Sequence, residues 1–473
     1  MPAPPYDAVV VGAGPNGLAA AITLARAGRS VLVLEANDAV GGGARSAGLT
    51  LPGFVHDLGS AIHPLALASP FFRTLPLDRH GLRWIQPEVP LAHPLDGHGA
   101  VLLERAVAAT AAGLGEDAAA YAALMAPLVR DATRLIPGAL APLRVPRHPL
   151  AMARFGLLGV RSAERVADRF AGERARALLA GSAAHSFLRL DQSLSAAFGL
   201  ILTLVGHAVG WPIPAGGSQS IADALAAHLR ELGGEIRTGF PVASLVDVPD
   251  SRVVLFDLTP RQVLAIAGDA LPPGYRRQLG RFRHGPGAFK LDYALDGPIP
   301  WTDPACLRAG TVHLGGALEE IAAGERAVRS GRHPERPFVL LAQQSLFDPS
   351  RAPAGQQTVW AYCHVPNGST QDMTAAIEAQ IERFAPGFRD RVLARVATAP
   401  ADLQRQNATL AGGDINGGVQ DWRQLFTRPA PLFPPYATPN PRLYFCSAST
   451  PPGGGVHGMC GHFAAKSALS RAW

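Results

Sequence analysis

The stretch YDAVVVGAGPNG, residues 6–17, decides the fold. Its apolar run leads into a Gly-x-Gly-x-x-Gly turn, and Ala- and Leu-rich residues follow as far as Ala27. The pattern predicts a strand, a glycine turn and a helix, the order in which a parallel α/β sheet binds a dinucleotide. We expect Gly12 to permit the tight turn, Gly14 to let the backbone approach a pyrophosphate, and Gly17 to let helix and strand pack closely. The amide groups at the helix N-terminus then face the phosphates.

A second strand and an acidic residue complete this unit. The run from Ser30 to Leu34 is apolar and predicts a parallel strand buried on both faces. Glu35 ends the run about 20 residues beyond the glycine turn, where a carboxylate accepts hydrogen bonds from ribose hydroxyls. The neighbours of these residues are predicted contacts of the dinucleotide as well: Pro15, Asn16 and Ala36.

A second glycine cluster follows Glu35 and indicates FAD rather than NAD. Residues 41–45 read GGGAR, and simple NAD domains need no such cluster at this place. Gly42, Gly43 and Ala44 predict another close approach of the backbone to the cofactor. Arg45 is expected to reach a phosphate or the flavin face.

A third glycine cluster lies near the C-terminus. Residues 447–458, SASTPPGGGVHG, follow an expected strand at 442–446 and open a helix. Backbone donors at such a point can stabilise negative charge on the N1/O2 side of a reduced flavin. We therefore predict non-covalent FAD held by both ends of the chain, with distal contacts from Ser449, Gly454, Gly455 and Val456.

Composition excludes several classes of protein. The chain has 473 residues, of which 48% are hydrophobic and 17% charged, enough for two or three domains with large cores. The net charge is +6, but no basic run carries interleaved aromatics, so we expect no nucleic-acid partner. A mildly basic surface leaves peripheral contact with an anionic membrane open. The cysteines are widely spaced, which fits a cytoplasmic protein without a dithiol motif or metal site: Cys306, Cys363, Cys446 and Cys460.

The middle of the chain is expected to supply the substrate site. Residues 100–210 are mostly helical in pattern, with a proline-rich break at 137–149. The apolar stretch from Ser195 to Trp211 predicts a buried helix or tunnel wall. Further patterns predict helices at 218–232 and 371–384, and strands at 253–258, 287–295 and 338–342.

The pattern GAGPNG, Glu35 and GGGAR resembles the flavin-dependent phytoene desaturase family of the amine-oxidase-like superfamily. WPIPAGGS (211–218) and LYFCSASTPPGGGVHG (443–458) are similar to further signatures of that family. The resemblance implies an α/β fold with a Rossmann-like FAD-binding domain of the glutathione-reductase/amine-oxidase type. It also implies an interleaved α+β substrate domain, made of a helical insert and a mixed sheet. The FAD domain would comprise residues 1–75, 212–285 and 425–473, and the substrate domain residues 76–211 and 286–424.

The same resemblance predicts further cofactor contacts, and it shows one segment in which this chain differs from the family. Val242 is expected beside the adenine, with Ser60, Ala61 and Thr259 elsewhere at the cofactor. The family usually has a β-meander after the adenine segment. Here Val253 follows Leu245 by only eight positions, so the meander is almost deleted. No second Gly-x-Gly-x-x-Gly follows a strand, so we expect no built-in NAD(P)H domain.

Three residues are candidate catalytic groups. Lys290, in AFKLDY, resembles the lysine that amine-oxidase-like enzymes place near flavin N5, and lysine occurs elsewhere only at Lys466. His457, in the distal glycine loop, and His63, in HDLGSAIHP, are candidate general bases. Asp57 is interpreted as fixing the turn at Gly59. The paired aromatics of amine oxidases are not found, because Val456 stands where that family has a tyrosine.

These observations predict an FAD-dependent oxidoreductase that transfers a hydride from a C–H bond of an apolar or lipid-like substrate to flavin N5. Oxygen, a quinone or another diffusing acceptor would reoxidise the flavin. Three alternatives stay open: a flavin-dependent isomerase, an amine-oxidase-like enzyme, and a non-catalytic protein that binds flavin or lipid.

Overall fold

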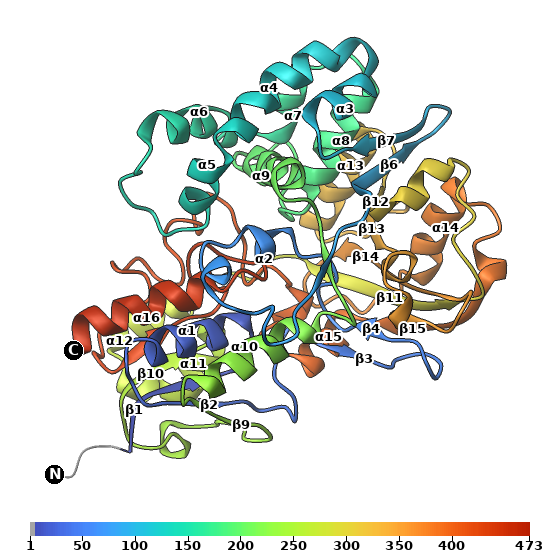
Figure 1. The fold of residues 1–473 in the computed structure, drawn as a ribbon. Coiled ribbons are helices and arrows are strands. Elements are labelled where there is room, and N and C mark those ends of the chain that lie inside the picture. Colours follow the sequence, from blue (N-terminus) through green and yellow to red (C-terminus); the bar gives the residue numbers. More distant parts are fainter. Residues whose placement is uncertain (1–4) are drawn as a thin grey trace.

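The computed structural model describes residues 5–473 and contains two large β-sheets with helices around them (Figure 1). A five-stranded sheet lies beside both termini, a seven-stranded sheet lies at the far side, and a layer of helices crosses above them. Among the residues described, no helix combines the length and the apolar character needed to cross a membrane.

The five-stranded sheet is parallel throughout. Its order is β16-β10-β1-β2-β9, so strands from the two ends of the chain are separated by β10 alone. The predicted first and second strands are confirmed. The strands are β1 (Tyr6–Val11), β2 (Val31–Leu34), β9 (Glu235–Arg237), β10 (Ser251–Phe256) and β16 (Leu443–Phe445).

Alternate side chains of this sheet face two layers of helices. Ala8, Val10 and Val33 pack towards α1, α10 and α16, whereas Val9 and Leu32 pack towards α11 and α12. This two-sided burial explains the unbroken apolar runs in the sequence. The helices are α1 (Pro15–Ala25), α10 (Gln219–Glu231), α11 (Pro260–Ala267), α12 (Pro273–Leu279) and α16 (Met459–Ala472).

The seven-stranded sheet is mixed, in the order β15-β11-β14-β13-β12-β6-β7. One face packs on α14 (Thr374–Phe384). The other face looks towards the helical layer. The strands are β6 (Val89–Leu95), β7 (Gly99–Leu103), β11 (Gly287–Leu295), β12 (Ala309–Leu314), β13 (Val339–Ala342), β14 (Gln357–Val365) and β15 (Val392–Thr398).

Most helices of the upper layer fall in the stretch predicted to be helical. They are α3 (Val107–Ala112), α4 (Ala118–Arg130), α5 (Ala132–Ala139), α6 (Pro149–Gly159), α7 (Ala163–Ala167), α8 (Glu173–Ala184) and α9 (Ser195–Ala208), with α13 (Leu318–Arg329) against α8. Shorter elements complete the fold: β3 (Ser46–Ala47) with β4 (His56–Asp57), β5 (Trp84–Ile85) with β8 (Ile213–Pro214), α2 (Pro64–Ala68) and α15 (Pro400–Gln406).

The structure corrects two details of the sequence interpretation. The strand expected at 253–258 is β10, which ends at Phe256, so Asp257 lies at its carboxyl end. β6 was not predicted, because Pro90 and Pro94 argue against a strand. No meander strand lies between β9 and β10 in the described chain, as expected. The five strands of the parallel sheet all lie in the segments predicted for the FAD domain, and the domain boundaries themselves stay a prediction.

The first and last helices of the chain cross at close range. Figure 1 shows blue α1 directly beside red α16. A Cβ at Gly461 of α16 would overlap the carbonyl oxygen of Asn16 in α1. Only glycine therefore lets the two helices approach this closely.

We expect Gly461→Ala to destabilise the fold by about 1–3 kcal/mol, because it overpacks the crossing of α1 and α16. Thermal unfolding measures this loss. Gly324→Ala is the control: a Cβ there meets its nearest atoms at 3.9 Å, in the middle of α13. That variant should keep or slightly raise the stability, and an equal loss in both variants would contradict the tight crossing.

Candidate cofactor and substrate site

One cavity of about 1420 Å³ extends from the first glycine turn to the helical layer. Nearly all the predicted site residues line it, although they come from distant parts of the sequence. They are Gly12, Gly14, Pro15, Asn16, Glu35, Ala36, Gly42, Gly43, Ala44, Ser60, His63, Ala61, Val242, Thr259, Lys290, Ser449, Gly454, Gly455, Val456 and His457. Gly17 and Arg45 are the predicted residues that do not.

Gly17 and Arg45 support the site from behind. A Cβ at Gly17 would overlap the carbonyl oxygen of Gly12, so Gly17 serves the close packing of helix on strand. Arg45 donates to the carbonyl oxygens of Gly42 and Gln406. Its guanidinium thus braces the glycine cluster, and its contact with a phosphate or the flavin face stays a prediction.

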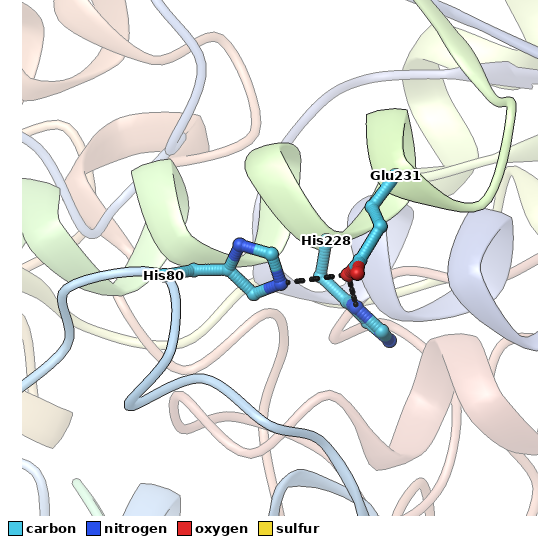
Figure 2. A group of neighbouring side chains, drawn as sticks. All are labelled: His80, His228 and Glu231. Atoms are coloured by element: carbon cyan, nitrogen blue, oxygen red, sulfur yellow. Dashed lines mark hydrogen bonds and ion pairs between the residues drawn. The ribbon is translucent and has the colours of Figure 1, made fainter.

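Within residues 5–473, a group of potential metal ligands lies outside this cavity. His80 Nε2 and His228 Nδ1 lie 3.0 Å and 3.2 Å from the same carboxylate oxygen of Glu231 (Figure 2). His228 and Glu231 belong to α10, and His80 lies in a turn before β5. We assign these two contacts to the packing of this turn on α10.

The glycine turn has the shape of a nucleotide cradle. Gly14 precedes α1, and Pro15 opens the helix, so the N-terminus of α1 faces the cavity. Gly42 has φ +53°, and a Cβ at Gly43 would meet nothing within 4 Å. The backbone of these two glycines is therefore directly accessible from the cavity. Glu35 accepts hydrogen bonds from the backbone amides of Ala13 (2.8 Å) and Asn37 (2.9 Å). Its carboxylate is thereby fixed at the groove.

The distal loop completes the cradle. At Gly454 a Cβ would lie 2.9 Å from the carbonyl oxygen of Asn416, and Gly455 has φ +118°, so this path requires glycine. The buried polar atoms at the cavity without a partner among residues 5–473 include Asn16 Oδ1, in the first glycine turn, and Ser449 Oγ, in the distal loop. Buried polar atoms usually have partners. The residues present therefore fit a polar cofactor with a pyrophosphate, as FAD is.

Asp257 is a member of this site that the sequence analysis missed. It accepts a hydrogen bond from the Gly17 amide (2.8 Å), and a Cβ at Gly14 would lie 2.7 Å from its carboxylate. Burial raises the pKa of this carboxyl to about 7, although the Gly17 N–H opposes the shift. Its position near the carboxyl end of the strand predicted at 253–258 was the available signal, because ligands bind at the carboxyl ends of parallel strands.

Lys290 is buried on β11, which rules out a surface lysine. Its Nζ pairs with Asp292 and lies 6.0 Å from the centre of the Trp360 ring. Asp292 Oδ1 lies 3.6 Å from His56 Nδ1 on its other side. Since the lysine is paired with a fully buried carboxylate, we assign it the charged form and the role of a donor at the cavity.

His63 is held by a buried polar network. Ser218 donates its single hydroxyl proton to the carbonyl oxygen of Ser60 (2.6 Å), so its 2.8 Å contact with His63 Nε2 requires the histidine to donate. His63 Nδ1 then carries a lone pair, and it has no partner among the residues described. Burial lowers the pKa of His63 to about 4, so the ring is neutral at neutral pH.

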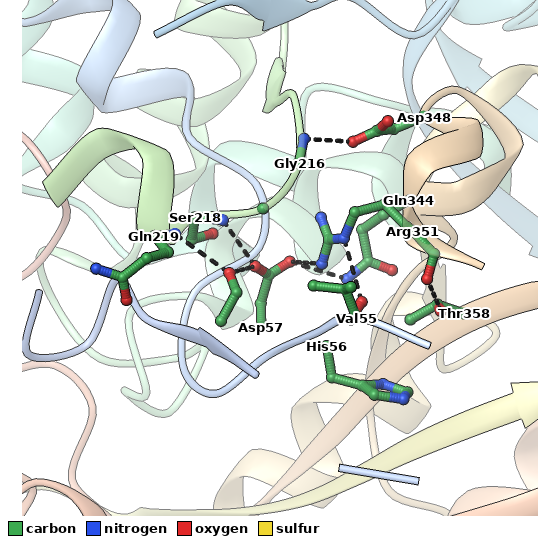
Figure 3. A network of polar contacts seen from close by, with 12 residues as sticks. Val55, His56, Asp57, Gly216, Ser218, Gln219, Gln344, Asp348, Arg351 and Thr358 are labelled. Atoms are coloured by element: carbon green, nitrogen blue, oxygen red, sulfur yellow. Dashed lines mark hydrogen bonds and ion pairs between the residues drawn. The ribbon is translucent and has the colours of Figure 1, made fainter. Parts of the chain in front are cut away.

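Asp57 anchors this network, which corrects its interpretation as a turn residue for Gly59. Figure 3 shows its carboxylate at the centre of contacts from three segments. It accepts from the Ser218 amide (2.8 Å), from Ser46 Oγ (2.7 Å) and from Arg351 (2.8 Å). Both charged side chains are fully buried, and the Arg351 guanidinium holds the pKa of Asp57 below its ordinary value against the effect of burial. The network fixes the position of His63 through Ser218.

His457 offers the opposite function to His63. Its Nδ1 accepts from the Met459 amide (3.1 Å), so the neutral ring carries its proton on Nε2. Burial lowers the pKa of His457 to about 4, and Nε2 has no partner within residues 5–473. His457 is therefore a hydrogen-bond donor beside the distal glycine loop.

The far end of the cavity has one apolar wall and one sheet wall. Helices α6 and α9 contribute Phe155, Phe198 and Ile201, and the expected tunnel wall at 195–211 is confirmed. The sheet contributes Trp360 and Tyr362, which the sequence analysis missed. Their rings are 5.0 Å apart and meet edge to face. Both lie on β14, which was not predicted.

Comparison with known proteins agrees with this geometry. Residues 10–75 match the family model of the NAD(P)-binding Rossmann-like domain. The chain is 27% identical to the pyridine nucleotide-disulfide oxidoreductase domain-containing protein 2 of Mus musculus, over 98% of this chain and 93% of that protein. It is 28% identical to the phytoene dehydrogenase of Streptomyces griseus, over 82% of this chain and 78% of that protein. The chain is a homologue of phytoene dehydrogenase.

The fold of this flavoprotein is shared with amine oxidases. The cyclohexylamine oxidase from Brevibacterium oxydans has a TM-score of 0.61 at 16% identity, over 98% of this chain and 99% of that chain. The motif, the cavity and these relatives together make the chain an FAD-type oxidoreductase. The resemblance drawn from the sequence motifs is thus confirmed.

The pKa of Asp257 predicts how FAD binding to this flavoprotein depends on pH. The carboxyl is neutral below about pH 7 and charged above it, beside the place of the pyrophosphate. FAD affinity should therefore fall by about tenfold as the pH rises from 6 to 8, since like charges a few ångströms apart repel by at least 1 kcal/mol. Fluorescence titration of the apoprotein with FAD measures the affinity.

Asp257→Asn should bind FAD as tightly at pH 8 as the parent does at pH 6, because the amide can still accept the Gly17 N–H without a charge. Asp269→Asn, at a fully exposed position, is the control and should keep the pH dependence. A parent protein whose FAD affinity does not change between pH 6 and 8 would contradict the assignment.

Proposed function

We propose that this flavoprotein takes a hydride from a C–H bond of a mostly apolar substrate, as a desaturase or dehydrogenase does. The observation that carries the proposal is the single cavity that joins the nucleotide cradle to a chamber lined by α6 and α9. Lys290, His63 and His457 all line this cavity and come from three different segments of the chain.

FAD, when bound, supplies a two-electron acceptor for the hydride. The chain supplies a base, and His63 suits that role best of the three candidates. Lys290 is paired with Asp292 and holds its proton, and His457 uses its lone pair on the Met459 amide. Of these three candidates, only His63 has a ring nitrogen whose lone pair has no partner within residues 5–473, and this nitrogen can accept the second proton from the substrate.

The remaining two groups act as donors. The Lys290 ammonium and the His457 N–H can stabilise negative charge that develops during the transfer. The apolar side chains of α6 and α9 exclude water, which strengthens these interactions. Together, the base, the two donors and the apolar wall support removal of a hydride and a proton from an apolar substrate.

We also propose that oxygen, a quinone or another diffusing acceptor removes the electrons. Large apolar side chains are exposed around the cavity, among them Leu143 (70%), Val160 (56%) and Phe433 (83%). This surface supports entry of an apolar substrate from a carrier or from a membrane.

Anaerobic reduction tests the function. The FAD-loaded protein is mixed with apolar candidates, and bleaching of the flavin absorbance reports hydride transfer. We expect His63→Gln to keep FAD but to slow bleaching by about 10²- to 10⁴-fold. His98→Gln, at a mostly exposed position, should react at the parent rate.

The pH profile gives a second check. Because burial sets the pKa of His63 near 4, its neutral form persists below the ordinary value of 6.5. The rate of reduction should stay level through pH 6.5 and fall only towards pH 4. A His63→Gln variant that reduces its flavin at the parent rate would remove His63 from the reaction.

A further inference from the structure

We propose that the substrate is a neutral, largely apolar molecule that carries a hydroxyl or carbonyl group, and that the sheet wall of the cavity binds this group. This inference rests on the proposed function and adds the class of substrate. It follows from three properties of the cavity. Neutral polar atoms on the sheet have no hydrogen-bond partner among the described residues, and the register of the strands fixes how far these polar atoms lie from Lys290. In addition, no carboxylate within residues 5–473 lines the substrate end.

The polar atoms lie on strands β12 and β14. Thr311 Oγ1 and Trp360 Nε1 are buried at the cavity without a partner among the residues described. Tyr362 also lines the cavity, and its hydroxyl makes no hydrogen bond within residues 5–473. Burial raises the pKa of Tyr362, so its hydroxyl stays protonated. Each such group costs about 1–3 kcal/mol if a ligand leaves it unpaired.

His185 adds an adaptable group to this wall. Its Nε2 lies 3.0 Å from His313 Nε2, so the two rings share one proton. Its Nδ1 makes no hydrogen bond within residues 5–473, and the residue lines the cavity. Burial and the nearby His364 lower the pKa of His185 to about 3, so the pair is neutral. Depending on which ring holds the shared proton, Nδ1 can donate to a carbonyl or accept from a hydroxyl.

Strand pairing fixes where this polar wall lies. Lys290 pairs with Tyr362, Tyr362 with Leu340, and Leu340 with His313. Neighbouring strands are about 4.8 Å apart, so the wall begins about 5 Å from Lys290 and reaches about 14 Å from it. The hydroxyl or carbonyl would thus lie within about 14 Å of Lys290, on the same sheet face.

The charged residues at the cavity disfavour an amine substrate, and the polar wall disfavours a pure hydrocarbon. Glu35 and Asp257 are the carboxylates among the lining residues, and both lie at the nucleotide cradle. The described lining residues of the substrate end include no carboxylate that could pair with an ammonium group, and Asp292 behind Lys290 is already paired with that lysine. A pure hydrocarbon would leave the polar wall unpaired. A neutral oxygen-containing molecule satisfies both constraints.

The test uses three probes of equal chain length: decanol, decane and decylamine. Their binding to the FAD-loaded protein is followed by the change in flavin absorbance. Thr311→Val and Tyr362→Phe remove one hydroxyl each and nearly preserve the volume. We expect each variant to bind decanol about five- to tenfold more weakly and decane equally well, the loss of one neutral hydrogen bond. Decylamine should bind the parent at least about tenfold more weakly than decanol.

Phe198→Leu, in the apolar wall, is the matched control and should weaken decanol and decane by the same factor. Decanol affinity that is unchanged in both hydroxyl-deleting variants, or tightest binding by decylamine, would overturn the inference. In either case the proposed function would stand, because an apolar chain still binds. If none of the probes binds to the parent protein, the apolar cavity itself and with it the proposed function would fail.

Discussion

The close contact of α1 with α16 is the interaction on which the site depends. These helices come from opposite ends of the chain, and the carbonyl oxygen of Asn16 lies where a side chain at residue 461 would be. Gly458, with φ +68°, turns the chain into α16 beneath Phe72. The loop at 447–458 is thereby held beside the first glycine turn. Neither glycine cluster would form a complete cradle without this crossing.

A second constraint is the register of the seven-stranded sheet. It places Lys290 in line with Tyr362 and His313, which are far apart in the sequence. One row of side chains across four strands thus contains both a charged donor and neutral hydrogen-bonding groups. The helices α6 and α9 close the chamber over this row with apolar side chains. The cofactor cradle and the substrate wall are therefore built by different sheets.

The cofactor site was largely predictable from the sequence because its signals are local. Gly12, Gly14 and Glu35 follow one another within a strand, a turn, a helix and a strand, and each type of residue has a physical reason at its place. Lys290 was found because lysine is rare in this chain and because its segment resembles a known strand. The direction of the Arg45 side chain could not be predicted, since nothing local tells whether a long side chain turns towards the cofactor or behind it.

The substrate wall was not predictable, because it depends on long-range pairing. Thr311, Trp360 and Tyr362 carry no motif, and their strands lie in stretches that gave no clear pattern. The role of Asp57 was not predictable for the same reason, since its partner Arg351 is 294 residues away in the sequence. Which histidine can act as a base also depended on tautomers, and these follow from hydrogen-bond partners that the sequence does not reveal.

Binding of FAD by the two ends of the chain is tested most directly by loading the purified protein. Titration with FAD, followed by gel filtration and measurement of the retained flavin absorbance, gives the stoichiometry. The structure predicts one tightly retained FAD for each chain, without a covalent bond, and no comparable retention of NAD. A protein that stays colourless after loading, or that retains NAD in place of FAD, would contradict the assignment of the cavity.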